Sequence, residues 1–339
     1  MKTVIFIVFF SLYFIPATLI RDRVISVFSV LWFVFTIIYV IYIYNNRDKE
    51  YEKTYMEEYY KSLPSNISPE ILGYLLTCST KKEYLTAVIM DLIRKESIKV
   101  RKEKKDYILI DNNEFDIYLS KSQLYIKKWF FKSMGNRKEV SFTDIKNEAK
   151  YNSGYFSYCY NEWMSLLNIE CARYDFFENK KDIIEFMLFY TSISILFILY
   201  NIFLTYNYIV AVLMLVAIIG FIIYINNFYR RNKESNEEYE EWMAFKRYLE
   251  KELNNIEKIN TDTLATYSVY AKILGLNKEF DDAIRNKTNK KIFEENELLS
   301  LISSNAIEEL DKIISFSVRK SFISTLFLVR NNGHNVLRK

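Results

Sequence analysis

One stretch of the sequence, Ile183–Phe228, constrains the fold more than any other. It holds two apolar runs that are joined by the short uncharged link Thr205-Tyr206-Asn207. Crossing a hydrocarbon core of roughly 30 Å takes about 20 apolar residues, and each run comes close to that length. The stretch therefore predicts a helical hairpin in a membrane, which would hold the preceding and following segments at one membrane face.

This hairpin is poor in the groups that couple transport to ions or protons. Apart from Glu185 near one edge, neither run contains an ionisable residue. Because coupled transporters usually place carboxylates or basic groups deep in the membrane, we interpret the hairpin as an anchor and spacer.

A second apolar hairpin begins the chain. Its runs Thr3–Ile20 and Val24–Tyr44 are each long enough to span, and Arg21-Asp22-Arg23 separates them. The alternative for the first run is a cleaved signal peptide, with Lys2 before the apolar core and Pro16-Ala17-Thr18 after it. Whether the first run is cleaved stays open. The sequence thus predicts a mainly α-helical membrane protein with four transmembrane helices in two hairpins.

Basic residues next to the helix ends are unevenly divided between the two membrane faces. Those on one face are Arg47, Lys49, Lys53, Lys180, Lys181, Arg230, Arg231 and Lys233. Only Arg21 and Arg23 fall on the other face. Because cytoplasmic loops carry the excess of Lys and Arg, we expect both termini and both soluble segments in the cytoplasm.

The first soluble segment, residues 45–182, is typical of a small α+β domain. Pro69 is well placed to start a helix, and Lys81–Lys95 carries apolar residues at helical spacing. Ser97–Val100 and Tyr107–Ile110 then alternate apolar and polar residues around a charged turn, which indicates a β-hairpin. Two helices followed by a two-stranded wing predict a winged-helix-like cytosolic domain.

After the central hairpin the pattern is helical. Residues 229–290 predict a small helical module, in which Gly275 ends a helix as its C′ residue. Residues 291–339 are a helical, partly amphipathic tail. Its part Phe316–Val329 is apolar and basic enough to lie on a membrane surface, and whether it does stays open. The expected domains are therefore 1–44, 45–182, 183–228, 229–290 and 291–339.

Composition argues against most site chemistry. Lys and Arg exceed Asp and Glu by only four, and the single histidine, His334, lies in the polar tail. The three cysteines, Cys78, Cys159 and Cys171, share no metal-ligand spacing, and the sequence has no phosphate-binding glycine loop or catalytic motif. We therefore expect a protein that is not an enzyme, with no catalytic, metal or cofactor residue and no small-molecule substrate indicated.

The turn of the predicted wing is the sharpest charge feature. Its basic residues are Lys99, Arg101, Lys102, Lys104 and Lys105. They could contact DNA phosphates, they could contact anionic lipid headgroups, or they could form a solvated turn. Residues 45–182 hold 24 basic and 22 acidic side chains, so the segment as a whole disfavours nucleic acid as a partner. Membrane lipids remain expected partners.

Five aromatic residues follow the central hairpin at helical spacing. They are Trp242, Phe245, Tyr248, Tyr267 and Tyr270. They either form the core of the C-terminal helical module or provide a face for a protein partner. The core is the interpretation that the spacing favours, and the sequence does not identify a partner.

Two blocks of sequence resemble a known family. The first is Asn66–Arg101, with Ser68-Pro69-Glu70-Ile71-Leu72-Gly73-Tyr74-Leu75-Leu76 followed by Leu85-Thr86-Ala87-Val88-Ile89-Met90-Asp91-Leu92. The second is Glu240-Glu241-Trp242-Met243-Ala244-Phe245-Lys246-Arg247-Tyr248-Leu249 with Tyr267-Ser268-Val269-Tyr270-Ala271-Lys272-Ile273-Leu274-Gly275-Leu276. In this order around a hairpin they are similar to the cytoplasmic and C-terminal part of the YciQ-like predicted bacterial membrane proteins, over residues 45 to 285.

This resemblance implies architecture and a bacterial cell membrane, but no catalytic residue, because the family has no agreed activity. Its members typically carry a large β-rich external domain before the first stable membrane helix. Here only Arg21-Asp22-Arg23 occupies that place, so an external sensing role is in doubt.

The sequence therefore supports three functional hypotheses. The first is a non-enzymatic integral membrane protein that acts as a scaffold or partner-binding platform. The second is a membrane-tethered DNA-binding regulator that uses the winged-helix-like segment. The third is an accessory subunit of a transport complex. Partner identity, oligomeric state and biological role stay open.

Overall fold

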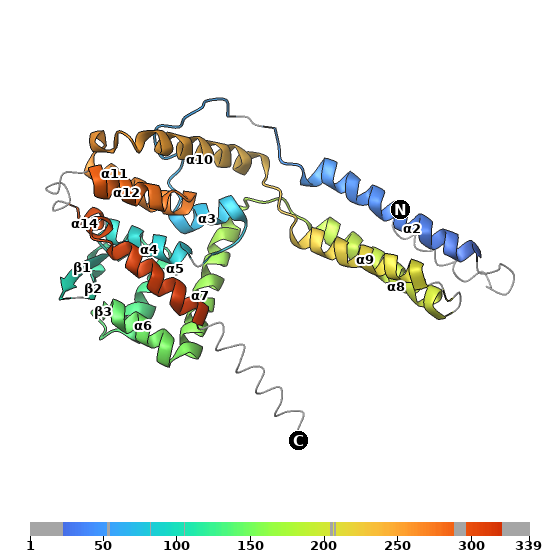
Figure 1. Ribbon diagram of the computed structural model, residues 1–339, viewed down its shortest axis with the longest axis horizontal. Helices are drawn as coiled ribbons and strands as arrows, with labels where there is room; N and C mark the ends of the chain where they lie inside the picture. The colour runs from blue at the N-terminus through green and yellow to red at the C-terminus, as the bar shows by residue number, and fades with distance from the viewer. Residues whose placement is uncertain are drawn as a thin grey trace, which may run out of the picture. The chain divides into compact units, whose positions relative to one another are not determined.

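The computed structural model divides the chain into two compact units, and each is described by itself. One unit comprises Met1–Tyr51 with Phe177–Asn232, and the other comprises Glu52–Phe176 with Lys233–Lys339 (Figure 1). The residues that the structure describes are 23–52, 55–81, 83–104, 106–203, 206, 208–287 and 296–320. The predicted span Thr3–Ile20, the wing residue Lys105 and the tail beyond residue 320 lie outside these ranges.

The first unit, which we call the membrane unit, contains three long apolar helices. They are α2 (Arg23–Ile43), which continues into the π-helical η1 (Tyr44–Asp48), α8 (Lys181–Phe203) and α9 (Tyr208–Asn226). Within the described residues, three segments are long and apolar enough to cross a membrane: Val27–Asp48, Lys181–Phe203 and Tyr208–Asn226. A helix satisfies its own backbone hydrogen bonds, as a segment surrounded by lipid must. The predicted central hairpin corresponds to α8 and α9.

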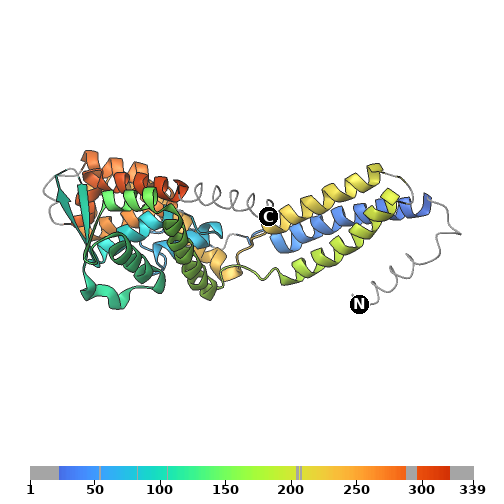
Figure 2. The same ribbon diagram turned by 90° about the horizontal axis from the view of Figure 1, so that it is seen from below.

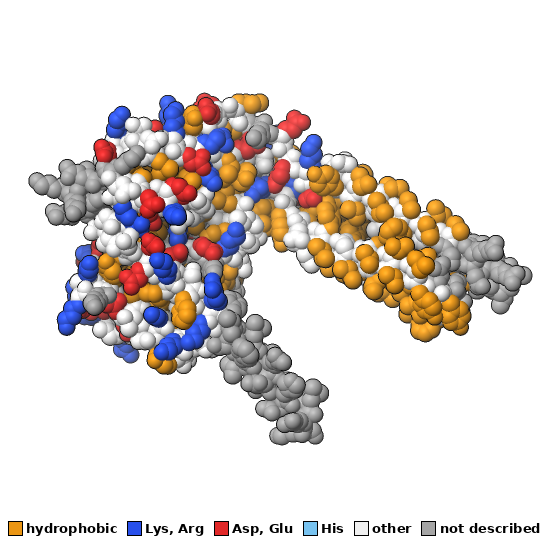
Figure 3. Space-filling model, in the orientation of Figure 1, with side chains coloured by type: hydrophobic (Ala, Val, Ile, Leu, Met, Phe, Trp, Pro, Cys, Tyr) orange, Lys and Arg blue, Asp and Glu red, His pale blue; other side chains and the backbone are white. Residues whose placement is uncertain are grey.

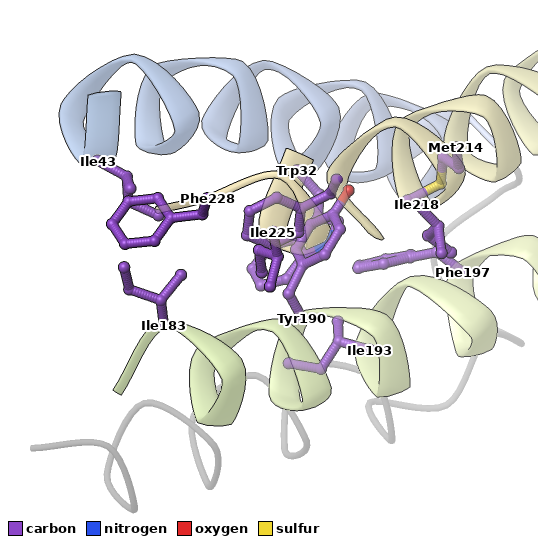
Figure 4. Packing of buried hydrophobic residues seen from close by; sticks show 11 residues of the cluster. Trp32, Ile43, Ile183, Tyr190, Ile193, Phe197, Met214, Ile218, Ile225 and Phe228 are labelled. Atoms are coloured by element: carbon purple, nitrogen blue, oxygen red, sulfur yellow. The ribbon is translucent and has the colours of Figure 1, made fainter. Parts of the chain in front are cut away.

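The three helices run alongside one another (Figure 2) and share an apolar core (Figure 4). Trp32 of α2 stacks on Tyr190 of α8, with ring centroids 5.5 Å apart, and Tyr190 meets Phe221 of α9 edge to face. Most apolar side chains on the outer surfaces of these helices stay exposed, and they cover the surface in Figure 3. An apolar exterior is what lipid tails would contact.

Neutral polar groups join α2 to α8 inside this core. The Trp32 indole Nε1 donates a 2.9 Å hydrogen bond to Ser194 Oγ, and Asn201 Nδ2 donates a 2.8 Å bond to Ser29 Oγ. Ser29, Ser194 and Asn201 are fully buried. Such interhelical hydrogen bonds fix the packing of membrane helices without burying a charge.

Charged residues gather where α2 ends, α8 begins and α9 ends, and they tie these ends together. The side chains of Arg47 and Asp182 approach to 3.9 Å, and Arg231 pairs with Glu50 at 2.8 Å. The guanidinium of Arg230 lies 3.9 Å from the centroid of the Tyr51 ring. Arg47, Arg230 and Arg231, three members of the predicted basic flanks, therefore lie at one end of the three-helix unit.

The second unit, which we call the soluble unit, begins with two helices and a hairpin, as the sequence predicts. These elements are α3 (Pro69–Thr77), α4 (Glu83–Arg94), β1 (Ile98–Glu103) and β2 (Asp106–Asp111). A third strand, β3 (Glu139–Ser141), pairs with β2 and completes an antiparallel sheet of order β1-β2-β3.

Helices fill the rest of the first half of this unit. They are η2 (Asn113–Tyr118), α5 (Lys121–Lys128), the π-helical η3 (Trp129–Met134), α6 (Phe142–Tyr151), α7 (Ser153–Cys171) and the short η4 (Ala172–Tyr174). Ser120 begins α5 with a capping box that includes Gln123, and Ser141 begins α6 with one that includes Asp144. The sheet lies beside α6, where Tyr107 of β2 contacts the Phe142 ring (Figure 1).

The described residues from Lys233 onward belong to the same unit and do not form a separate module. They contribute α10 (Lys233–Glu252), η5 (Ile256–Lys258), α11 (Thr261–Leu274), α12 (Asn277–Lys287), α14 (Glu297–Ser303) and a helix over residues 306–320. Tyr270 of α11 donates a 2.7 Å hydrogen bond to the Ile67 carbonyl before α3, and Thr86 of α4 donates one of 2.8 Å to Asp311. Gly275 ends α11 in the left-handed conformation, as expected.

The described residues 306–320 of the predicted tail form a packed helix, and most of Phe316–Val329, the part that could lie on a membrane surface, falls outside the described residues. Leu310, Ile314 and Val318 repeat every four residues along helix 306–320 and are buried. Asp311 on the same helix also forms a 3.0 Å ion pair with Lys272 of α11. The apolar stripe faces the protein core because α4 and α11 offer it a partner surface.

Candidate functional site

The wing cations lie on both faces of an exposed hairpin. Successive side chains of a strand point to opposite faces, so Lys99 and Arg101 share one face of β1 and Lys102 points to the other. Arg101 forms a 3.2 Å ion pair with Glu139 of β3, and Lys102 Nζ lies 5.6 Å from the centroid of the Tyr107 ring. The sheet therefore divides the cations that the sequence brings together, and Lys104 adopts a positive φ at the turn.

The five aromatic residues after the central hairpin lie at the contact between α10 and α11. Trp242, Phe245, Tyr267 and Tyr270 are buried, and Tyr248 is half-buried. The ring centroids of Trp242 and Tyr270 are 5.1 Å apart, as are those of Phe245 and Tyr267. The buried rings thus belong to the packed interior of the soluble unit.

A cavity of about 790 Å³, lined mostly by polar side chains, is a candidate site in the described part of the soluble unit. It lies among the start of α3, the end of α4, the start of α5, the end of α7 and α11. Its walls are formed by Asn66, Ile67, Ser68, Ile71, Asp91, Arg94, Lys95, Tyr118, Leu119, Ser120, Lys121, Gln123, Glu170, Arg173, Tyr174 and Tyr270. Its volume falls in the range of small-molecule sites.

Asp91 is the buried charge at the centre of the wall. Arg94 donates to its Oδ1 from Nε at 3.0 Å and from Nη2 at 2.7 Å, and Lys95 Nζ lies 2.7 Å from Oδ2. Asp91 is almost fully buried, whereas Arg94 and Lys95 keep about a quarter of their side-chain surface exposed. A buried carboxylate needs this compensation, because desolvating an ion is costly.

Gln123 connects Asp91 to a second buried carboxyl group. Its Nε2 donates to Glu70 Oε1 at 3.0 Å and lies 3.4 Å from Asp91 Oδ2. Glu70 is fully buried, and its Oε2 has no hydrogen-bond partner among the described residues. Burial, together with repulsion from Asp91, raises the pKa of Glu70 to about 7. Near neutral pH this carboxyl is therefore divided between its neutral and charged forms.

The rim of the cavity has a different character. Glu170 accepts hydrogen bonds from the backbone N–H and the hydroxyl of Ser122, so it satisfies a backbone donor in the first turn of α5. Lys121 and Arg173 are exposed and form no ion pair within the ranges that the structure describes. Tyr118 and Tyr174 add exposed rings. The arrangement offers positive charge and aromatic surface to a ligand.

The cysteines do not add nucleophilic chemistry to this region. Burial raises the pKa of the Cys171 thiol to about 12, and Cys159 is buried as well. The described residues hold no group of three or more His, Cys, Asp or Glu side chains that could bind a metal ion.

Sequence reasoning missed the cavity, although one signal was present. In the sequence, Asp91 is the one charged residue of the run Tyr84–Ile93, and in the structure all ten residues of that run are buried. A carboxylate on a fully buried helix requires nearby cations, which Arg94 and Lys95 supply one turn later. Glu70 and Gln123 had no comparable signal, because their meeting depends on how α3 and α5 pack.

One family model matches most of the chain. It is described as the C-terminal domain of a predicted membrane protein family, DUF2207, and it matches residues 56–284. The match confirms the resemblance drawn from the two sequence blocks. Searches of curated proteins and of solved structures found no match.

Proposed function

Because the chain belongs to the DUF2207 family of predicted membrane proteins, we propose that it is a non-enzymatic scaffold or partner-binding platform at the cytosolic membrane face. The membrane unit supplies the anchor. The soluble unit supplies the binding surface. A family of unknown function does not assign a role, so the proposal rests on the surfaces of this chain.

The observation that carries the proposal is an aromatic face on α7. Tyr155, Tyr158 and Ile169 recur at helical spacing, and all three are exposed. The Tyr155 and Tyr158 rings stack with centroids 6.4 Å apart, and Tyr158 is 59% exposed. Tyrosines are enriched in protein interfaces because they bury a large area at low entropy cost. We define Tyr155, Tyr158 and Ile169 as the α7 face.

Purification of the full chain from native membranes in mild detergent tests this function. We expect a protein partner to copurify in stoichiometric amount. The amount of this partner should fall about tenfold when Tyr155→Ser and Tyr158→Ser are combined. Met56→Ser, at another exposed apolar residue of the soluble unit, is the matched control and should keep the partner. A chain that purifies alone, or a partner retained equally by both variants, would contradict the proposal.

The cytosolic orientation rests on the basic helix ends of the membrane unit. Arg47, Arg230 and Arg231 lie at one end, and cytoplasmic flanks carry such residues in excess. Tyr206 lies in the link between α8 and α9. With the native cysteines replaced, Tyr206→Cys should react with an impermeant maleimide in intact cells, and Asn46→Cys only after permeabilisation. The reverse pattern would overturn the orientation.

DNA binding by a winged-helix-like segment is the competing function. The separation of Lys99 and Lys102 onto opposite faces of the wing disfavours it, because phosphate contacts need cations on one surface. Retention of the full chain on duplex DNA with a steep salt dependence would favour it.

A role as an accessory subunit of a transport complex is a special case of the platform. In that case the protein that copurifies with the chain would be a transporter.

A further inference from the structure

The charges that line the cavity of the soluble unit do not cancel. The residues that line it include four cations and two carboxylates, an excess of two positive charges, and Glu70 is bound by Gln123 but is not itself among the lining residues. Both carboxylates are already engaged by groups of the chain. Asp91 accepts from Arg94 and Lys95, and Glu170 accepts from Ser122.

The excess positive charge lies at the rim. Lys121 follows the N-cap of α5, and Arg173 lies in η4 just after α7. Within the part of the chain that the structure describes, neither has an ion-pair partner. Two basic side chains held beside one cavity repel each other, and a bound anion would relieve that repulsion.

Two helices begin at the same wall. The helices α3 and α5 both begin at the cavity wall, after Ser68 and Ser120 respectively. Helix N-termini carry a partial positive charge and favour anions. At α5 part of this charge is offset, because Glu170 already accepts from the N–H of Ser122, so the side chains of Lys121 and Arg173 remain the main source of positive potential.

The deeper wall is organised before any ligand arrives. The Gln123 amide donates to Glu70, and Arg94 donates to Asp91 through two nitrogens. These contacts fix the buried side chains, so binding would not have to order them, and preorganisation of this kind favours affinity. Only the exposed side chains at the rim would have to become ordered when a ligand binds.

We propose that this cavity binds a phosphate group, carried by a small soluble molecule or by a lipid headgroup, with Lys121 and Arg173 as its principal cationic contacts. A phosphate monoester carries between about −1.5 and −2 charges at pH 7, which matches the excess charge of the lining. Arg and Lys are the usual phosphate-binding side chains, and Arg can bind two phosphate oxygens at once. The exposed rings of Tyr118 and Tyr174 would contact the remainder of the ligand.

Titration of the full chain with inorganic pyrophosphate tests the site. The chain is reconstituted in phosphatidylcholine nanodiscs, and calorimetry measures the affinity. We expect saturable binding that weakens about tenfold or more when Lys121→Glu and Arg173→Glu are combined. The control combines Lys132→Glu and Lys146→Glu, which remove equal charge from exposed positions outside the cavity, and should bind as the unchanged chain does. Thermal unfolding checks that both double variants are folded.

A second set of nanodiscs distinguishes the two sources of phosphate. If phosphatidylglycerol in the disc weakens pyrophosphate binding to the unchanged chain, the lipid headgroup occupies the site. Equal binding in both discs supports a soluble phosphate compound. The proposal is overturned if the unchanged chain shows no saturable pyrophosphate binding in phosphatidylcholine discs, or if both double variants lose binding equally.

Discussion

The two units of the molecule bury polar side chains in different ways. Between the long apolar helices of the membrane unit the buried polar partners described above are neutral, as in the bond from Trp32 to Ser194. In the soluble unit they are charged: Asp91 is paired with Arg94 and Lys95 in the cavity wall. In the soluble unit, water can reach the more exposed partner of each of these ion pairs. Lipid tails, by contrast, cannot solvate a charged group. The surroundings of each unit thus limit which polar groups its interior can hold.

The largest effect is expected at the buried Lys127, which tests the charged half of this comparison. Its ammonium group lies 2.8 Å from Asp111 and also pairs with Asp116, and the side chain is 4% exposed. Lys127→Ala leaves both carboxylates without this partner and should lower the free energy of unfolding of the soluble unit by about 3 kcal/mol. Urea unfolding of the chain in detergent measures the loss.

The next residue provides the control. Lys128 is exposed on the same helix, so Lys128→Ala should change the free energy of unfolding by less than about 0.5 kcal/mol. Equal losses in the two variants would mean that helix propensity, and not the buried ion pairs, explains the effect.

Removing the charge of Glu70 should raise the free energy of unfolding, whereas removing the charge of Lys127 should lower it. The difference arises because the charged form of Glu70 is not well compensated. Its pKa is about 7 in the folded chain against 4.5 for a free carboxyl, so the folded state binds more protons between these values. Stability therefore falls as the pH rises from about 4.5 through about 7. One pKa unit corresponds to about 1.4 kcal/mol, so the ionised group costs about 3 kcal/mol at pH 8.

Replacing this carboxyl tests that account. Glu70→Gln keeps the shape and removes the charge, so it should stabilise the soluble unit at pH 8 by up to about 2 kcal/mol and have little effect at pH 5. Thermal unfolding at the two pH values measures the difference. A Glu70→Gln variant that is less stable at pH 8 would mean that the buried charge is favourable.

The neutral pairs of the membrane unit should contribute less. Ser194→Ala removes the acceptor of the Trp32 indole and should cost about 0.6 kcal/mol, the average for hydrogen bonds between membrane helices. Ser192→Ala is the control, because the Ser192 hydroxyl donates to Leu188 within its own helix. Reversible unfolding in mixed micelles measures both. If Ser194→Ala lowers the free energy of unfolding by more than about 2 kcal/mol, the neutral hydrogen bonds of the membrane unit contribute about as much as the buried ion pairs of the soluble unit, and the contrast between them fails.

The sequence predicts elements that depend on local pattern. The apolar runs of α2, α8 and α9 can be identified by length alone, and the alternation around the wing predicts β1 and β2. The family resemblance was also available, since it depends on contiguous blocks. What periodicity misses is β3, only three residues long, whose pairing with β2 is a long-range contact.

Contacts between distant segments could not be predicted in the same way. The Tyr270 hydroxyl donates a hydrogen bond to the Ile67 carbonyl, although the central hairpin separates the two residues in the sequence. This bond joins two segments that the sequence presents as separate domains. The candidate cavity depends on the same packing, because Glu70, Asp91 and Gln123 come from three different helices. A single sequence gives the helices but not the angles at which they meet.

The smallest effect is expected at the exposed wing, where Arg101 pairs with Glu139. The Arg101 side chain is 52% exposed and that of Glu139 is 33% exposed, so water and salt screen the pair. Arg101→Ala should therefore change the free energy of unfolding by less than about 0.5 kcal/mol, against about 3 kcal/mol for Lys127→Ala. Urea unfolding in low and high salt measures both variants. A similar loss for the two would show that burial does not determine how much an ion pair contributes in this unit, and the contrast between its interior and its surface would fail.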